Sequence, residues 1–353
     1  MQRREFTQAL AALAANPAQA EVALLTHAHG PHLSAYIEGL AKAPEVAKVY
    51  LADPASEQQV RKGLGPRLAG VYRSAEQLFA SQKPQLALIP MEARLAPPVI
   101  AAALSAGCHV MAEKPACVRA EDFAPLAATA NSRKLHLMLA FANRIDPVTR
   151  QARRLIQSGT IGKLYGMEMR IIADQTRLTR PAYHNTWTAQ KSRAGGGHLI
   201  WLGIHWLDLA AYITGSPIAK IAAFTGNVGG QPIDTEDSAA AAFQFANGTF
   251  GTLTSGYYLD RSKELFLKFW GAKGWMEIHL DRPANPLEWQ VNGQPVQHAK
   301  PEGPSGYTPW VQHVVRVALG LEPPVLTANE SLHTLQTVFA GYRAAETGRT
   351  QLI

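Results

Sequence analysis

The sequence has 353 residues, which exceeds the usual size of one hydrophobic core and predicts two domains or one enlarged domain. Its 47% hydrophobic and 17% charged residues are typical of a globular protein, and its glycines and prolines follow no Gly-X-Y period, which excludes a collagen-like fibre. The formal net charge is +7, but the basic residues are dispersed. We therefore expect an anionic small ligand or a mildly basic surface, and no nucleic-acid partner.

Cysteine content and hydropathy narrow the class further. Cys108 and Cys117 are the only two cysteines, too few for a disulfide framework or a zinc site, so we expect two core thiols and no metal. No stretch approaches the roughly 18 consecutive apolar residues of a membrane helix, so no membrane span is predicted.

The N-terminal segment 1–20 has two interpretations. An arginine pair precedes Phe6, a weakly apolar Ala/Leu tract and an Ala-Gln-Ala sequence, a pattern similar to a twin-arginine export signal. The helical spacing of Leu10 and Leu13 fits a plain N-terminal helix equally well. We expect a retained helix and a cytoplasmic protein, with periplasmic export as the alternative.

Residues 21–141 alternate short apolar runs with helical stretches. Strands are expected at 21–26, 46–52, 85–89, 108–112 and 135–140. Helices are expected at 31–42, 97–106 and 120–130. This alternation indicates right-handed crossovers and a parallel sheet covered on both faces. The first domain is therefore predicted to be an α/β, doubly wound Rossmann domain.

Residues 142–353 have a different character, beginning with a helix at 147–158 and a glycine turn at 158–163. Long strands joined by hairpin-like turns are expected at 164–174, 218–226, 238–245, 249–258, 264–270 and 274–279. Helices are expected at about 197–214, 306–319 and 330–347. This second α/β domain is predicted to hold a mostly antiparallel open sheet, with its C-terminal helix 330–347 packing back on the first domain.

The first strand-to-helix turn, residues 26–32, lies where a dinucleotide domain usually carries G-x-G-x-x-G. That fingerprint is absent, although Gly30 is followed by Pro31, which suits the first position of a helix. Thr26, His27, Gly30 and His32 are the expected cofactor contacts of this turn. Its histidines lack a nearby carboxylate, which argues against a metal site.

Asp53 ends the second expected strand about twenty residues after this turn, where a carboxylate binds the ribose 2′-hydroxyl of a dinucleotide. No arginine follows it directly to bind a 2′-phosphate, which favours NAD over NADP. The alternative is that Asp53 only caps its strand.

A second motif, Glu113-Lys114-Pro115, directly follows the expected strand 108–112. Ligands of open α/β sheets bind beyond the carboxyl ends of the strands, so Lys114 is expected in the ligand crevice.

A third motif is the helix that follows the glycines at 195–197. It is apolar nearly all round, yet His198, Trp201, His205 and Asp208 fall on one face, because their spacing is close to whole helical turns. A polar stripe on a buried helix needs partners or a ligand, although a satisfied core histidine is the usual explanation for either histidine alone.

Together these motifs resemble the glucose-fructose oxidoreductase and inositol dehydrogenase family (Gfo/Idh/MocA), over residues 21 to about 347. The resemblance is carried by the following segments in chain order: Glu113-Lys114-Pro115, Phe141-Ala-Asn-Arg144, Ser158 to Lys163, the glycines at 195–197 with Gly-Ile-His205 and Asp208, and 233–239. It implies a Rossmann domain that holds NAD(P), glutamate and lysine contacts from Glu113 and Lys114, and a C-terminal sheet that forms a homo-oligomer interface in a dimer or tetramer.

The resemblance also implies oxidation of a sugar or polyol between the domains, with Lys114 and His205 as catalytic residues. It extends the expected substrate contacts to a set drawn from the second domain: Asn143, Arg144, Tyr183, His184, Lys191, Trp201 and Asp208. Two positions depart from the family pattern. Trp201 stands where the family has an aspartate four residues before the histidine, and segment 90–94 replaces the usual Thr-Pro-Asn.

Three alternative functions are consistent with these motifs and with the family resemblance. The leading one is hydride transfer between a carbinol carbon of a sugar, polyol or glycoside and nicotinamide, with His205 or Lys114 taking the hydroxyl proton. The second is glycoside cleavage with tightly bound NAD, through transient oxidation, elimination and reduction. The third is a non-catalytic sensor or scaffold with a degenerate cofactor site.

Overall fold

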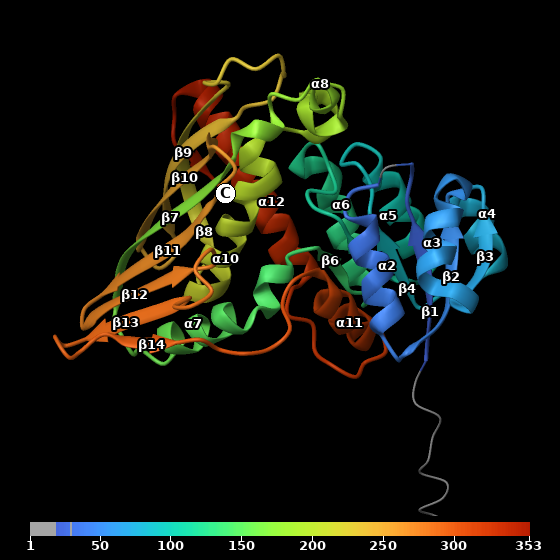
Figure 1. The fold of residues 1–353 in the computed structure, drawn as a ribbon, viewed down its shortest axis with the longest axis horizontal. Helices are drawn as coiled ribbons and strands as arrows, with labels where there is room; N and C mark the ends of the chain where they lie inside the picture. Colours follow the sequence, from blue (N-terminus) through green and yellow to red (C-terminus); the bar gives the residue numbers. More distant parts are fainter. Residues whose placement is uncertain (1–18, 29) are drawn as a thin grey trace, which may run out of the picture.

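The computed structural model describes residues 19–28 and 30–353, which form two domains lying side by side (Figure 1). The first domain is built on a six-stranded sheet and the second on a nine-stranded sheet. The expected N-terminal helix or export signal falls almost entirely on residues 1–18, outside the described part of the chain. Within the described part, no helix is both long enough and apolar enough to cross a membrane.

The first sheet is parallel throughout, in the order β3-β2-β1-β4-β5-β6. Residues 22–25 and 86–89 of its two central strands are fully shielded from solvent, which explains their uninterrupted apolar sequences. The strand order reverses between β1 and β4, which makes their carboxyl ends the topological switch point of the sheet. The doubly wound prediction is confirmed. The strands are β1 (Ala20–Leu25), β2 (Val46–Ala52), β3 (Leu68–Tyr72), β4 (Leu86–Ile89), β5 (His109–Ala112) and β6 (Leu137–Leu139).

Helices cover both faces of this sheet. Strand β3 and helices α3 and α4 were not predicted from the sequence. Strand β3 is a short, partly exposed edge strand, and α3 and α4 span only eight and seven residues, so none gives a long periodic pattern. The helices are α2 (Leu33–Lys42), α3 (Glu57–Leu64), α4 (Ala75–Ser81), α5 (Ala96–Ser105) and α6 (Ala120–Ser132).

The second sheet has the order β14-β13-β12-β11-β7-β10-β9-β8-β15 and is antiparallel except where β7 pairs with β10. The mostly antiparallel prediction is therefore confirmed. Strand β13 and the two edge strands β14 and β15 were not predicted. The strands are β7 (Leu164–Asp174), β8 (Ile218–Gly226), β9 (Ser238–Phe245), β10 (Phe250–Leu259), β11 (Glu264–Gly271), β12 (Gly274–His279), β13 (Leu287–Val291), β14 (Gln297–Ala299) and β15 (Gln351–Leu352).

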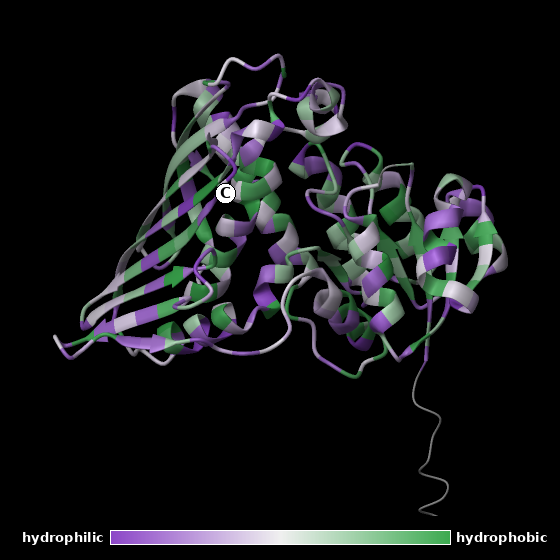
Figure 2. Cartoon of the chain, viewed as in Figure 1, coloured by the Kyte–Doolittle hydropathy of each residue, from purple (hydrophilic) through white to green (hydrophobic). Residues whose placement is uncertain are grey.

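One face of this sheet packs on helices α7 (Pro147–Gln157), α10 (Ile204–Thr214) and α12 (Ala328–Thr347), whereas no described element covers the other face (Figure 1). Strand β9 shows the alternation that results, since Ala241 and Phe243 are buried while Ala242 is exposed. Figure 2 shows hydrophobic and hydrophilic residues interleaved along these strands.

Two C-terminal helices connect the domains. Helix α11 (Tyr307–Ala318) packs along α2, and its fully buried Trp310 donates a hydrogen bond to the Met111 sulfur at 3.0 Å. Helix α12 contacts both α6 of the first domain and β8 of the second. The segment 142–353, expected to form the second domain alone, thus contributes α11 to the packing of the first.

Candidate active site

The turn between β1 and α2 crosses the topological switch point. The Thr26 hydroxyl donates to the carbonyl oxygen of Pro90 at 3.0 Å, which joins the carboxyl ends of β1 and β4. A Cβ atom at Gly30 would lie 2.2 Å from Thr26 Oγ1 and 2.5 Å from Pro90 O. Only glycine therefore allows the turn to approach β4 this closely.

His27 links this turn to the loop after β4. Its Nε2 accepts a hydrogen bond from the Glu92 backbone N–H at 3.0 Å, while its Nδ1 lies 2.8 Å from Ala28 O. These contacts fix the tautomer with the proton on Nδ1. The buried Glu92 carboxylate also accepts hydrogen bonds from Nε and Nη2 of Arg193, one on each oxygen. Segment 90–94 therefore connects the turn to helix α9 (Lys191–Ala194).

Asp53 follows β2 directly and caps the short helical turn Pro54–Ser56. Its Oδ1 accepts from the Ala55 N–H at 3.1 Å and its Oδ2 from the Ser56 hydroxyl at 2.6 Å. The structure therefore supports a capping role for Asp53, at the helical turn rather than at the strand. A carboxylate has about four lone-pair positions, so these two bonds leave capacity for a ribose hydroxyl.

Glu113 lies at the centre of a buried polar cluster. Its carboxylate accepts from the Tyr36 hydroxyl at 3.0 Å, the Tyr307 hydroxyl at 3.1 Å and the Lys114 N–H at 3.1 Å, and His32 Nδ1 lies 3.0 Å away. Burial and the nearby carboxylate raise the pKa of both tyrosines well above its usual value, so both remain donors. Glu113 and His32, expected as cofactor contacts, are thus bonded to each other and to α11.

Lys114 follows a strand of the first domain but reaches the second. Its buried Nζ donates to the Trp201 carbonyl oxygen at 2.5 Å and lies 3.6 Å from the centre of the Trp201 ring. Burial lowers the pKa of Lys114 to about 8. An ammonium poised near neutrality can release or bind a proton at physiological pH.

Trp201 lies on the π-helical segment Leu199–Gly203 that leads into α10. Its ring stacks against His32 with 5.8 Å between centroids, and it meets Trp187 edge to face at 5.3 Å. The indole therefore lies between the first turn, the Lys114 ammonium and the 175–195 segment. π-Helical turns are frequent at functional sites, but nothing in the apolar sequence of this helix predicted one.

His205, one turn beyond Trp201, has a buried Nδ1 with no hydrogen-bond partner among the described residues. Its ring meets Phe141 edge to face at 5.8 Å. Burial, with Lys114 and His32 nearby, holds the pKa of His205 well below its usual value. The imidazole is therefore neutral at pH 7, and its surroundings disfavour the protonated form.

The other members of the predicted polar stripe have structural partners. His198 Nδ1 lies 2.7 Å from the Ser255 hydroxyl, and burial lowers its pKa to about 3. Asp208 binds the Arg144 guanidinium, whose remaining N–H groups donate to Glu330 at 2.7 Å and to Val325 O at 2.9 Å. Among the described residues, Asp208 is thus fully paired, His198 is bonded through Nδ1 while its buried Nε2 has no partner, and His205 Nδ1 has none.

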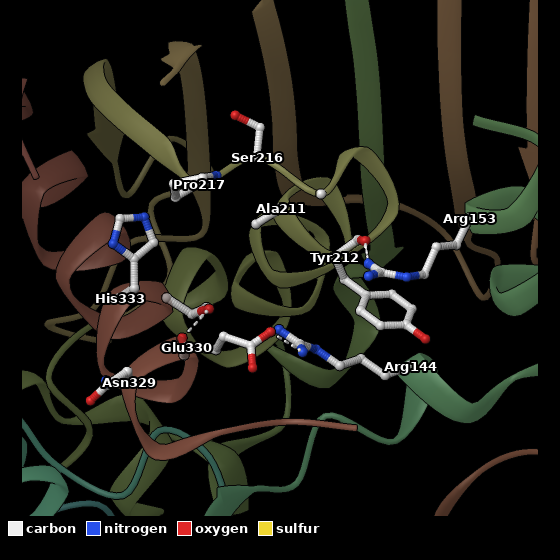
Figure 3. A pocket seen from close by; sticks show the side chains of 11 residues that line it. Arg144, Arg153, Ala211, Tyr212, Ser216, Pro217, Asn329, Glu330 and His333 are labelled. Atoms are coloured by element: carbon white, nitrogen blue, oxygen red, sulfur yellow. Dashed lines mark hydrogen bonds and ion pairs between the residues drawn. The ribbon is translucent and has the colours of Figure 1, made fainter. Parts of the chain in front are cut away.

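The Arg144 network lies apart from Lys114, at a separate cavity of about 450 Å³ (Figure 3). There the Tyr212 ring lies between the guanidinium groups of Arg144 and Arg153, at 4.9 and 4.3 Å. The structure does not bring Arg144 and Asp208 to the cleft where they were expected to bind substrate. Their charges neutralise each other inside the protein, which spacing along the chain could not reveal.

Two other cavities are lined by residues of the π-helical segment, Trp201 in one and Leu202 in the other, and they share no lining residue. The first, of about 450 Å³, lies between the β1–α2 turn and the segment before α9, and Trp201 forms part of its wall. The second, of about 430 Å³, is lined by Asn143, His205 and residues of β7 and β11. We call these the turn cavity and the His205 cavity. The turn cavity is lined by His27, Ala28, Pro31, His32, Asn185, Thr186, Trp187, Thr188, Arg193 and Trp201.

The remaining expected substrate contacts lie in the segment that connects β7 to the π-helical segment. Tyr183 belongs to the short helix α8 (Pro181–His184) and stacks on Arg177, while His184 Nε2 lies 2.6 Å from Leu178 O. Lys191 is exposed and pairs with Glu346 at 3.2 Å. None of Tyr183, His184 and Lys191 lines the turn cavity or the His205 cavity.

The glycines at 195–197 anchor the π-helical segment. A Cβ at Gly197 would lie 1.9 Å from the Glu236 carbonyl oxygen, so this contact requires glycine. The Glu236 carboxylate accepts from the Gly197 and Leu199 N–H groups at 2.6 and 2.9 Å and from the Tyr342 hydroxyl at 2.7 Å. Segment 233–239 therefore caps the helix that carries Trp201 and His205.

Sequence reasoning missed several residues of the site. Tyr307 reaches it from α11, and Trp187, Arg193 and Glu92 reach it from loops. Their sequence surroundings give no signal, because their proximity depends on how the two domains pack.

The fold and this cleft define a two-domain protein with a dinucleotide-binding Rossmann domain. The family model for the NAD-binding Rossmann domain of the Gfo/Idh/MocA oxidoreductases matches residues 8–141, and the model for the family's C-terminal domain matches residues 149–277. The chain therefore belongs to the Gfo/Idh/MocA oxidoreductase family, as the sequence motifs predicted.

Curated relatives share parts of the chain. D-glucoside 3-dehydrogenase of Escherichia coli is 34% identical over 154 residues, 43% of this chain and 42% of the relative. Trans-1,2-dihydrobenzene-1,2-diol dehydrogenase of Mus musculus is 26% identical over 223 residues, 63% of each chain. The chain thus aligns with less than two thirds of the length of these relatives.

Solved structures share the fold over nearly the whole chain. An oxidoreductase domain protein from Kribbella flavida has a TM-score of 0.84 at 19% identity, covering 95% of this chain and 100% of the other. Levoglucosan dehydrogenase in complex with NADH and levoglucosan has a TM-score of 0.82 at 17% identity, covering 94% and 99%. These likenesses define the fold.

Proposed function

We propose that the protein is an NAD-dependent oxidoreductase that transfers a hydride between a carbinol carbon of a carbohydrate and nicotinamide. The carbohydrate class comprises sugars, polyols and glycosides. The observation that carries the proposal is the buried Lys114 ammonium, bonded to the Trp201 carbonyl oxygen one helical turn before His205, whose Nδ1 has no partner among the described residues. The lowered pKa of Lys114 supports it.

The residues at the switch point fit a dinucleotide. His27 and His32 of the β1–α2 turn line the turn cavity, and Asp53 lies at the end of the adjacent strand. Nicotinamide, when bound, supplies the hydride acceptor or donor. The absence of an arginine directly after Asp53 supports NAD over NADP.

The protein's own residues manage the proton and the alcohol oxygen. Neutral His205 offers its free Nδ1 as a hydrogen-bond partner for the hydroxyl, and the Lys114 ammonium polarises the oxygen or, once deprotonated, accepts the hydroxyl proton. The Trp201 indole covers the ammonium, and Trp201 lines the turn cavity but not the His205 cavity. Because reacting atoms must approach to about 3–3.5 Å, we infer that this indole moves when both ligands bind.

The test is an absorbance scan of the purified protein with NAD and a panel of sugars, polyols and glycosides. Growth of the reduced-nicotinamide band near ~340 nm with at least one of them supports the proposal. Release of an aglycone without that band would instead identify the internally recycled, glycoside-cleaving reaction. No NADH binding in a fluorescence titration would favour a sensor or scaffold.

Replacing Asp53 with alanine should weaken cofactor binding while turnover at saturating NAD is retained. A hydrogen bond to a charged group contributes about 1.5–3 kcal/mol, so the Kd for NADH should rise roughly 10- to 100-fold. Asp174→Ala is the matched control, because Asp174 caps the short helix Gln175–Arg177 through the same pair of bonds. Equal Kd values for all three proteins would remove Asp53 from the cofactor site.

The pH profile of alcohol oxidation should show a limb near pH 8. Lys114 has a pKa lowered to about 8, so its neutral, proton-accepting form grows as pH rises through that value. His205 is already neutral across this range. We expect kcat/KM to rise with pH and level off above about 8, and Lys114→Met to lose this limb. A limb that persists unchanged in the variant would assign it to another group.

We also propose a homo-oligomer, a dimer or tetramer, formed through the outer face of the nine-stranded sheet. That face and its edge expose Phe224 and Phe250, 82% and 63% accessible, together with Tyr258 and Trp270. Exposed aromatic residues grouped on one face are typical of interaction surfaces. Sedimentation of wild-type protein and of Phe224→Asp, which should dissociate, tests this interface. We propose a cytoplasmic location, where a free NAD pool is present.

A further inference from the structure

The His205 cavity has walls made mainly of hydrocarbon. It lies between α10, strands β7 and β11 and the residue after β12, and its volume of about 430 Å³ suits a small organic ligand. Its apolar lining comprises Ile171, Ile172, Ala173, Leu202, Trp206, Leu265 and Leu280.

Few polar groups in this cavity are free to bind hydroxyls. Trp206 Nε1 already donates to the Phe266 carbonyl oxygen at 3.0 Å, so the indole presents carbon to the cavity. Asp146 uses Oδ1 to cap α7 through the Val148 N–H at 2.8 Å. Apart from His205, the polar lining is then Asn143, Lys263 and Ser305, together with the second oxygen of Asp146.

The proportion of apolar to polar side chains in this cavity distinguishes a free sugar from a sugar that carries a hydrocarbon substituent. The seven apolar side chains outnumber these five polar ones, so a ligand hydroxylated all round would place some of its hydroxyls against hydrocarbon. Each hydroxyl buried without a partner costs free energy because it loses its bonds to water. A hydrocarbon substituent placed against the same walls is favoured, because apolar surface is removed from water. The cavity therefore suits a ligand with one hydroxylated edge and one apolar flank.

We propose that the substrate is a glycoside with an apolar aglycone, with the reacting hydroxyl toward His205 and the aglycone against Ile172, Leu265 and Leu280. The sugar part of this assignment rests on the proposed function, whereas the apolar flank rests on the cavity alone. A free monosaccharide or an inositol is then a poor ligand.

Calorimetric titration with matched methyl and phenyl glycosides of D-glucose, D-galactose and D-mannose tests the proposal. A phenyl ring that buries on the order of 100 Å² is expected to tighten binding at least ~10-fold over the methyl partner. The free sugars should bind more weakly than either glycoside. If no pair shows this gain, including the case where no glycoside binds, the proposal is overturned.

A pair of leucine variants locates the effect. Leu280→Gln places an amide in the apolar wall and should reduce the phenyl preference to that of the methyl glycosides. Leu352→Gln is the control, because Leu352 is 78% exposed on the edge strand β15 and lines no part of this cavity. Retention of the full preference in Leu280→Gln would place the aglycone elsewhere. The wild-type series remains decisive if Leu280→Gln does not fold.

A parallel fluorescence titration with NADH separates this inference from the proposed function. NADH binding without a phenyl preference overturns the substrate assignment and leaves the oxidoreductase standing. A phenyl preference without NADH binding retains the apolar cavity and overturns the oxidoreductase.

Discussion

Lys114→Met is expected to lower kcat by roughly 10² to 10⁴-fold, the usual contribution of a positioned acid or base, while the Kd for NADH stays unchanged. The methionine keeps the hydrocarbon stem that packs beneath Trp201 and removes only the ammonium, which now contacts the Trp201 carbonyl oxygen and ring. The expected loss therefore reflects chemistry and not a cavity in the core.

The measurement combines steady-state kinetics, on the substrate found in the absorbance scan, with NADH titration and thermal unfolding. Lys62→Met is the control, because Lys62 is an exposed lysine near the end of α3. An unchanged kcat in Lys114→Met would remove the mechanism proposed for this cleft.

Asp208→Ala is expected to lower the free energy of unfolding by about 3–5 kcal/mol, because it leaves the Arg144 guanidinium buried without its main counterion. Glu330 remains as a partly exposed partner at 2.7 Å, which places the effect toward the lower end. Asp208 lies on the same helix as His205 but serves the Arg144 ion pair and not the proposed chemistry. At a low temperature we therefore expect kcat to fall less, in proportion, than the free energy of unfolding.

Urea unfolding monitored by circular dichroism gives the value, with Asp122→Ala as control. Asp122 pairs with the exposed Arg119 at 2.8 Å, and removing that pair should change stability far less. A loss in Asp208→Ala as small as in the control would mean that the Arg144 network is not a stabilising element.

Much of the fold follows from local sequence patterns. Strand β2 coincides with its predicted range 46–52, and β7, β8, β9 and β12 also match their predicted bounds. Long apolar or alternating runs with clear ends give these elements a strong signal. Strands β3, β13, β14 and β15 gave no such signal, because they are short and partly exposed. All except β13 lie at the edge of their sheet.

The site was less predictable than the fold. The positions of Asp53 and Lys114 at strand ends follow from topology alone, since ligands of such sheets bind beyond the carboxyl ends. The partners of these residues do not, because Tyr307, Trp187 and Arg193 approach only when the domains pack. The roles of Arg144 and Asp208 were equally hidden, since a buried ion pair and a substrate contact look alike in sequence.

The central claim is that a nicotinamide dinucleotide binds at the switch point and gains access to Lys114 and His205. A crystal structure with NAD and phenyl glucoside tests it most directly. We expect electron density for the dinucleotide across the carboxyl ends of β1 and β4, with the Trp201 indole displaced from the Lys114 ammonium. Density elsewhere, or an indole still covering that ammonium with both ligands bound, would contradict it.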